Sequence, residues 1–311
     1  FGYDPFYFHM FSLLLHIGCV CLVWKLISSL LRVHGGVSEK QILYVNFITT
    51  LLFAVHPINV EAVAWISALK VLLYAFFYLL GLLCYLRYIR TSKIFYYVLT
   101  IGCFLCSFWG KEQAVTFPLA LLIVDWFTNR NMKNLEVWSE KMSFLIMAFF
   151  FGIITVLSQG KGPYEMIFPL YQRLLFGCFA LVEYITKSLL PVNLNFFYPF
   201  PIVLGEEPPL HYYLYPVVLL FLMGWIIAYR NNRYLVFGVL LFLVNLLFSI
   251  HLFNMSRHAI VADRYMYLSY VGIAFLIANG IWWLRKRLSY FKAALVFLFF
   301  YCCRLNVVRM S

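Results

Sequence analysis

Long apolar runs separated by short polar connections are the feature that most constrains what this chain can fold into. Hydrophobic residues make up 64% of the 311 positions and charged residues 12%, whereas about a quarter of a soluble domain is charged. The runs are residues 6–31, 42–55, 71–86, 94–109, 115–127, 142–157, 174–190, 212–229, 234–252, 265–284 and 291–302. Because they lack a period of two, they predict an all-α polytopic transmembrane bundle of about ten spans, forming one domain over residues 1–311.

Lys and Arg are concentrated in a few of the connections. The chain carries 24 basic and 12 acidic residues, a net charge of +12, but these basic residues do not line one solvated face. They therefore predict membrane orientation and contact with membrane lipids, and no nucleic-acid partner. The clusters expected to be cytoplasmic lie at residues 87–93, 130–141, 230–233 and 285–292. Asp125 lies at the expected cytoplasmic end of the run 115–127, and is expected only to mark the membrane interface.

The number of runs between two of these basic connections indicates that one run does not cross the membrane. Three runs separate residues 130–141 from residues 230–233, although both connections should lie on the same side. The run at 174–190 contains Glu183 and Lys187, which are costly to place in hydrocarbon. We expect a re-entrant or surface-lying (interfacial) helix there. The alternative, that one connection has the opposite orientation, stays open.

Cysteine and histidine spacing does not predict a disulfide framework, a metal site or a cofactor. The eight cysteines lie inside or at the edges of apolar runs, as small buried side chains do. His9 and His16 can share a helix face, but no acid or thiol set accompanies them. The sequence also lacks a P-loop, a dinucleotide glycine fingerprint and a Gly-x-Ser-x-Gly motif, so ATP hydrolysis is not indicated.

Two polar motifs at predicted outer helix ends contain candidate functional residues, because charges beside a bilayer mark functional sites by default. The first, HPINVEAVAW, contains His56 and Glu61, and could equally be an interfacial helix with an acid in its first turn. The second, GKEQ, contains Lys111 and Glu112. Lys111 can present an ammonium to a phosphate, with Glu112 positioning it or binding a hydroxyl. A self-neutralising turn between two helices is the alternative.

A third motif carries the strongest signal for an anionic ligand. It consists of NMSRH, which includes Arg257, followed by ADRYMY, which includes Asp263, Arg264 and Tyr267. An arginine can bind phosphate through two parallel hydrogen bonds, which lysine cannot copy. The adjacent Asp263 can orient the arginine or act as a base. A helix cap beside an aromatic belt is the structural alternative.

Taken in order, these motifs resemble the membrane part of the tetratricopeptide-repeat-bearing GT-C glycosyltransferases, which include the transmembrane O-mannosyltransferases and their bacterial relatives. The segments that carry the resemblance are FGYDPF, HPINVEAVA, GKEQAVT, LLPVNL with FYP, and VADRYMYL. The resemblance implies transfer of a sugar, commonly mannose, from a polyprenyl- or dolichyl-phosphate donor to a protein hydroxyl. It places the reaction on the periplasmic or luminal face, and the lipid-linked sugar is a substrate, not a cofactor.

The resemblance also implies roles for individual residues. Arg264 and Lys111 would bind the lipid phosphate, and Glu61 the sugar or the acceptor. Asp263, Glu112 and His56 would orient these groups, and Tyr267 and Arg257 complete the candidate binding set. The catalytic base would lie in an outer loop upstream of Phe1, together with a first helix, and the repeats would follow Ser311. We therefore expect this chain alone to be inactive.

Two functions of other classes stay open at the level of sequence. A transporter or flippase for a lipid-linked sugar could use the same cations, although it predicts an inverted repeat and no convincing one is visible. A non-catalytic membrane scaffold for repeats is the second. The pattern of the His56 and Lys111 motifs favours the bacterial inner membrane over the endoplasmic reticulum.

Overall fold

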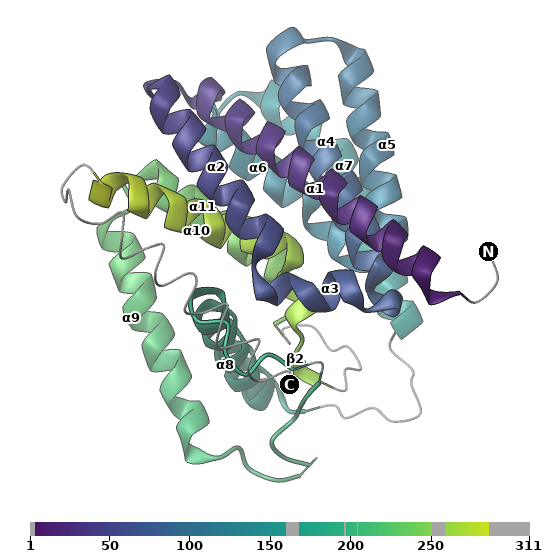
Figure 1. Cartoon of the computed structure of the whole chain (residues 1–311), viewed down its shortest axis with the longest axis vertical. Coiled ribbons are helices and arrows are strands. Elements are labelled where there is room, and N and C mark those ends of the chain that lie inside the picture. Colours follow the sequence, from purple (N-terminus) through teal and green to yellow (C-terminus); the bar gives the residue numbers. More distant parts are fainter. Residues whose placement is uncertain (1–3, 160–167, 196, 204, 251–258, 286–311) are drawn as a thin grey trace.

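The computed structural model describes residues 4–159, 168–195, 197–203, 205–250 and 259–285 (Figure 1). The α-helices in these ranges are α1 (Pro5–His34), α2 (Glu39–Val55), α3 (Val60–Ala64), α4 (Leu69–Thr91), α5 (Ile94–Gly110), α6 (Phe117–Phe127), α7 (Leu135–Gln159), α8 (Leu170–Leu189), α9 (Leu214–Ala228), α10 (Arg233–Leu246) and α11 (Met266–Arg285). Ten of the eleven predicted runs overlap helices, and the run at 291–302 lies outside the described residues. The all-α membrane fold is confirmed.

Short elements connect these helices. The described 3-10 helices are η1 (Pro57–Asn59), η2 (Ile66–Ala68), η3 (Glu112–Thr116), η4 (Leu210–Tyr213) and η5 (Asp263–Tyr265). Two short strands, β1 (Tyr198–Pro199) and β2 (Ala259–Val261), pair in antiparallel orientation. This pairing was not expected from the sequence. It joins the FYP segment to the backbone that leads into Asp263.

The expected count of about ten spans is not confirmed. Five described helical segments are long and apolar enough to cross a membrane: Pro5–His34, Ile66–Thr91, Leu135–Thr155, Leu210–Ala228 and Asp263–Arg285. Helix α2 and the segment Pro57–Ala64 form a pair bent by 49°, which raises the number to six if the pair is one span. The apolar helices α5 and α10 have 17 and 14 residues, fewer than the about 20 that an upright span requires.

The helices form a bundle with a smaller layer beside it (Figure 1). Helices α4 and α5 pack side by side, α1 packs on α2 and α4, and α11 packs between α10 and α2. Glycines permit the closest of these contacts, because a Cβ on Gly272 would lie 2.5 Å from the carbonyl oxygen of Gly238. Helices α8 and α9 contact each other and lie below α10 and α11 in this view.

The helix directions define two ends of the bundle. At one end, which we call the motif end, Glu61 contacts Arg264 and Lys111 contacts Tyr265. At the other, which we call the basic end, His34 closes α1 and its Nδ1 lies 2.8 Å from the carbonyl oxygen of Phe127 at the end of α6. The described parts of the three polar motifs therefore meet at one end, as their predicted sidedness requires.

Helix α8 is the helix that we expected not to cross. Its buried residues include Phe176, Ala180 and Tyr184, which recur every four residues and form one face. Arg173, Glu183 and Lys187 give it three charged side chains, and it is not among the described segments that are apolar enough to cross. Its re-entrant or surface-lying position stays a prediction.

Gly110 lets α5 approach α4 at the motif end. A Cβ at this position would lie 2.7 Å from the backbone nitrogen of Tyr74. Gly110→Ala is therefore expected to lower the free energy of unfolding by about 1–3 kcal/mol, because the two backbones must separate. Gly102→Ala, on the same helix but facing open space, is the matched control and should be neutral or stabilising. Unfolding in detergent measures both, and equal stability of the two variants would contradict the prediction.

Candidate functional site

Glu61 and Arg264 form an ion pair that connects α3 with η5. The Arg264 Nη1 lies 2.5 Å from one carboxylate oxygen of Glu61, and the Arg264 backbone N–H donates to the other at 2.7 Å. The two side chains are 21% and 9% exposed, so a ligand at the surface can reach the guanidinium. Because Glu61 holds both the backbone and the side chain, it sets the direction in which Arg264 points.

Lys111 and Arg264 lie against the same aromatic ring. The Lys111 Nζ is 4.3 Å from the ring centroid of Tyr265, and the Arg264 Cζ is 5.1 Å from it. The ring of Trp65 lies 4.9 Å from the same Cζ. Cation–π contacts of this kind hold a positive charge without neutralising it. The tertiary structure thus brings together the two cations that were predicted to bind phosphate.

Lys187, Asp263 and Tyr198 form a second unit beside this pair. The Lys187 Nζ is 3.6 Å from Asp263 Oδ1 and 3.3 Å from the ring centroid of Tyr198, whose hydroxyl donates to Asp263 Oδ2 at 3.0 Å. Burial lowers the pKa of Lys187, although the Asp263 carboxylate opposes this shift. Burial, reinforced by Asp263, raises the pKa of Tyr198. Sequence reasoning missed both residues as members of the site, although a lysine inside an apolar run and the FYP segment, which contains Tyr198, were available as signals.

His56 and Glu112 have less direct positions. His56 is buried, and its Nδ1 accepts a hydrogen bond from the backbone of Ile58 at 3.3 Å, which caps η1. Its ring lies 4.3 Å from that of Tyr270. Glu112 is half-buried at the start of η3, next to Lys111. His56 therefore caps a short helix, and the orienting roles of His56 and Glu112 stay predictions.

Tyr267 lies in the core, not on the surface of the site. It is fully buried, with its hydroxyl 2.7 Å from His16 Nδ1, while His16 Nε2 lies 3.1 Å from the carbonyl oxygen of Ala54. Nε2 must donate to that carbonyl, so Nδ1 accepts from Tyr267 and both ring nitrogens are used. Tyr267 is therefore not accessible to a ligand at the surface of the site. Arg257 lies outside the described residues.

Metal ligation finds no support in the part of the chain that the structure describes. There, no group of three or more His, Cys, Asp or Glu side chains could hold an ion. His16 is occupied by Tyr267 and Ala54, as described above. The chemistry of the described site is therefore that of cations, carboxylates and aromatic rings.

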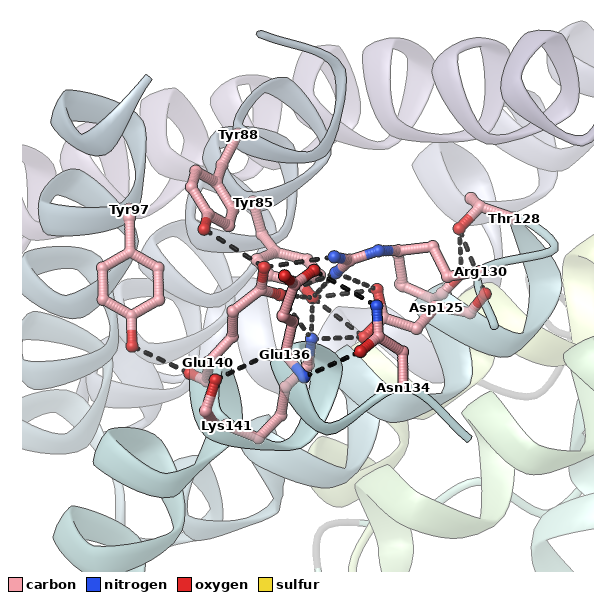
Figure 2. Close-up of polar contacts among 12 residues, drawn as sticks. Tyr85, Tyr88, Tyr97, Asp125, Thr128, Arg130, Asn134, Glu136, Glu140 and Lys141 are labelled. Carbon is pink, nitrogen blue, oxygen red and sulfur yellow. Dashed lines mark hydrogen bonds and ion pairs between the residues drawn. The ribbon is translucent and has the colours of Figure 1, made fainter. Parts of the chain in front are cut away.

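A second charged cluster, at the basic end, surrounds the hydroxyl of Tyr85 (Figure 2). This oxygen lies 2.8 and 2.9 Å from the two carboxylate oxygens of Asp125 and accepts from Arg130 Nη1 at 3.0 Å. Lys141 contacts both Tyr85 and Asp125, and Arg130 forms an ion pair of 2.7 Å with Glu140. The expectation that Asp125 only marks the interface is wrong, because its side chain is fully buried and ion-paired.

This basic-end cluster, formed by Tyr85, Asp125, Arg130, Glu140 and Lys141, connects three helices. Tyr85 belongs to α4, Asp125 to α6, and Glu140 with Lys141 to α7. Two cations face two carboxylates, and the hydrogen bond to Glu140 raises the pKa of Arg130. Because these charges balance within the cluster, it has the properties of a structural clamp and not of a site for a charged ligand.

The chain is similar to animal protein O-mannosyl-transferases. It is 28% identical to protein O-mannosyl-transferase Tmtc3 of Drosophila melanogaster over 153 residues, which is 43% of this chain and 16% of that protein. It is 33% identical to human protein O-mannosyl-transferase TMTC2, over 44% of this chain and 16% of the relative. The Xenopus laevis tmtc2 protein is 29% identical over 51% of this chain and 18% of the relative.

These relatives confirm the resemblance that the motifs predicted. No family model matches the chain, and no solved structure matches it. The matched segment covers less than a fifth of each of these three relatives. Since all three come from animals, they lend no support to the predicted bacterial setting, which stays a prediction.

Proposed function

We propose that this chain is the membrane part of a glycosyltransferase that transfers a sugar, with mannose as the first candidate, from a polyprenyl- or dolichyl-phosphate donor to a protein hydroxyl. One observation carries the proposal. Arg264 and Lys111 are gathered on the ring of Tyr265 at the motif end of an apolar bundle, in a chain similar to protein O-mannosyl-transferases. This is where the headgroup of a lipid-linked donor would lie.

The cations suit the leaving group of such a transfer. As the bond between the sugar and the phosphate breaks, negative charge grows on the phosphate, and pre-positioned donors stabilise it. A guanidinium carries five N–H donors, more than the Glu61 ion pair requires, so Arg264 can hold a phosphate while Glu61 holds its direction. Lys111 is buried and adds a second positive charge, with its Nζ 4.3 Å from the ring centroid of Tyr265.

The carboxylates of the motif end act in this proposal as orienting groups. Glu61 is paired with Arg264, and Asp263 is paired with Lys187 and Tyr198. Both carboxylates are occupied by these contacts, so we assign neither as the general base that accepts the proton of the acceptor hydroxyl.

Orientation follows from the charges of the two ends. The basic end contains Arg90, Arg130 and Arg233, and basic residues favour the cytoplasmic side. The motif end would then face the periplasm or the lumen. An integral membrane location is supported by the five described segments that are long and apolar enough to span.

The test is sugar transfer by the full-length protein that contains this chain, reconstituted in liposomes. Radiolabelled mannosyl phosphoryl dolichol and an acceptor protein should give labelled acceptor, whereas GDP-mannose in place of the lipid-linked donor should not. Movement of the donor between leaflets without transfer of its sugar would show that the protein is a flippase and would contradict the proposal. Absence of donor binding, transfer and movement would favour the scaffold.

A further inference from the structure

We infer that Lys187 is a positioning residue, which neutralises Asp263 and so keeps Arg264 available to the donor phosphate. The inference rests on the proposed function, because it assumes that Arg264 binds an anionic headgroup. It assigns a role to a residue on α8 that lies outside all three polar motifs. It also predicts that α8 affects donor binding without touching the donor.

The charges around Arg264 create the need for such a residue. Glu61 already pairs with the guanidinium, and Asp263 directly precedes Arg264 in η5. An uncompensated Asp263 carboxylate would repel a phosphate and compete with it for Arg264. At this buried position water screens the repulsion poorly, because the Asp263 side chain is only 5% exposed.

Lys187 and Tyr198 both contact this carboxylate. Lys187 forms an ion pair with Oδ1 at 3.6 Å, which is too long for a hydrogen bond, and the Tyr198 hydroxyl donates a hydrogen bond to Oδ2 at 3.0 Å. The Tyr184 hydroxyl makes further contacts of 3.1 and 3.3 Å with the backbone N–H and carbonyl of Ala262. Helix α8 thereby fixes the segment that enters η5 and presents Arg264.

Lys187 itself is poorly placed to bind the headgroup. Its Nζ is ion-paired with Asp263 Oδ1 at 3.6 Å and lies 3.3 Å from the ring centroid of Tyr198. Its ammonium is paired with Asp263 inside the protein, whereas the Arg264 side chain is 21% exposed. The effect of Lys187 on a phosphate should therefore pass through Asp263.

The experiment measures binding of farnesyl phosphate and of farnesol to the full-length protein in detergent. Lys187→Met should weaken farnesyl phosphate binding about tenfold and leave farnesol binding unchanged, because the unpaired Asp263 carboxylate repels the phosphate and not the uncharged alcohol. Lys187→Arg, which keeps the charge, should stay within about threefold of wild type. The double variant Lys187→Met with Asp263→Asn removes both charges and should recover most of the lost affinity. Lys133→Met, an exposed lysine at the basic end, is the control.

Each outcome separates the inference from the proposed function. Unchanged phosphate binding in Lys187→Met would overturn the inference alone, as would a double variant that binds as weakly as the single one. A wild-type protein that does not prefer farnesyl phosphate to farnesol would overturn the proposed function, and the inference with it. If Lys187→Met does not fold, Tyr198→Phe decides. This variant removes the hydroxyl that donates to Asp263 but keeps the aromatic ring. It should weaken farnesyl phosphate binding by about threefold and leave farnesol binding unchanged. Wild-type affinity for farnesyl phosphate would refute the inference.

Discussion

Replacing Arg264 by Met is expected to lower sugar transfer by about 100- to 1,000-fold, the loss seen when a donor aimed at developing charge is removed. Glu61 contacts the guanidinium at 2.5 Å and the Arg264 backbone N–H at 2.7 Å, and the rings of Trp65 and Tyr265 lie 4.9 and 5.1 Å from the Arg264 Cζ. A side chain fixed in this way loses little freedom on binding a phosphate. The fall should appear in kcat as well as in kcat/KM, because charge on the phosphate grows in the transition state.

Two further variants make this prediction specific. Arg264→Lys keeps the charge but loses the planar fork, and should cost about tenfold, between wild type and Arg264→Met. Arg285→Met, at the opposite end of α11 and stacked on Tyr44, removes an arginine without touching the motif end and should transfer sugar normally. Steady-state kinetics with a lipid-linked mannose donor measure all three. Turnover of Arg264→Met at the wild-type rate would remove this residue from the phosphate role.

Lys141→Met is expected to lower the free energy of unfolding by about 3–5 kcal/mol, because it leaves the buried Asp125 carboxylate without its ammonium partner. Both side chains are fully buried in the basic-end cluster, so water cannot replace the lost partner. The cluster joins α4, α6 and α7 (Figure 2). Loss of the lysine should therefore destabilise the packing of all three helices.

A double variant tests the cause of this loss. Lys141→Met combined with Asp125→Asn removes both charges and should recover a large part of the stability. Arg32→Met breaks an ion pair with Glu39 whose side chains are 58% and 77% exposed, and should cost less than about 1 kcal/mol. Equilibrium unfolding in detergent measures the three variants. Equal stability of Lys141→Met and Arg32→Met would show that the buried pair is not a clamp.

Local sequence patterns predicted the helical part of this protein well. An apolar run must satisfy its backbone hydrogen bonds within itself in a membrane, so its length and lack of charge are enough to predict a helix. Ten of the eleven runs accordingly overlap helices. The number of spans was less predictable, since 17 and 14 residues in α5 and α10 are too short for upright crossings, and tilt depends on neighbouring helices.

The sequence by itself also determined which residues were candidates. Glu61, Lys111, Asp263 and Arg264 stood out because charges beside apolar runs are rare and costly. Only the tertiary structure decided their partners: Glu61 and Arg264 are 203 positions apart, and Lys187 reaches Asp263 from α8. It likewise showed that Asp125, which was expected at the membrane interface, is buried and ion-paired with Lys141. Helical periodicity acts over a few residues, whereas the pairing of charges depends on how distant helices pack, which no local pattern encodes.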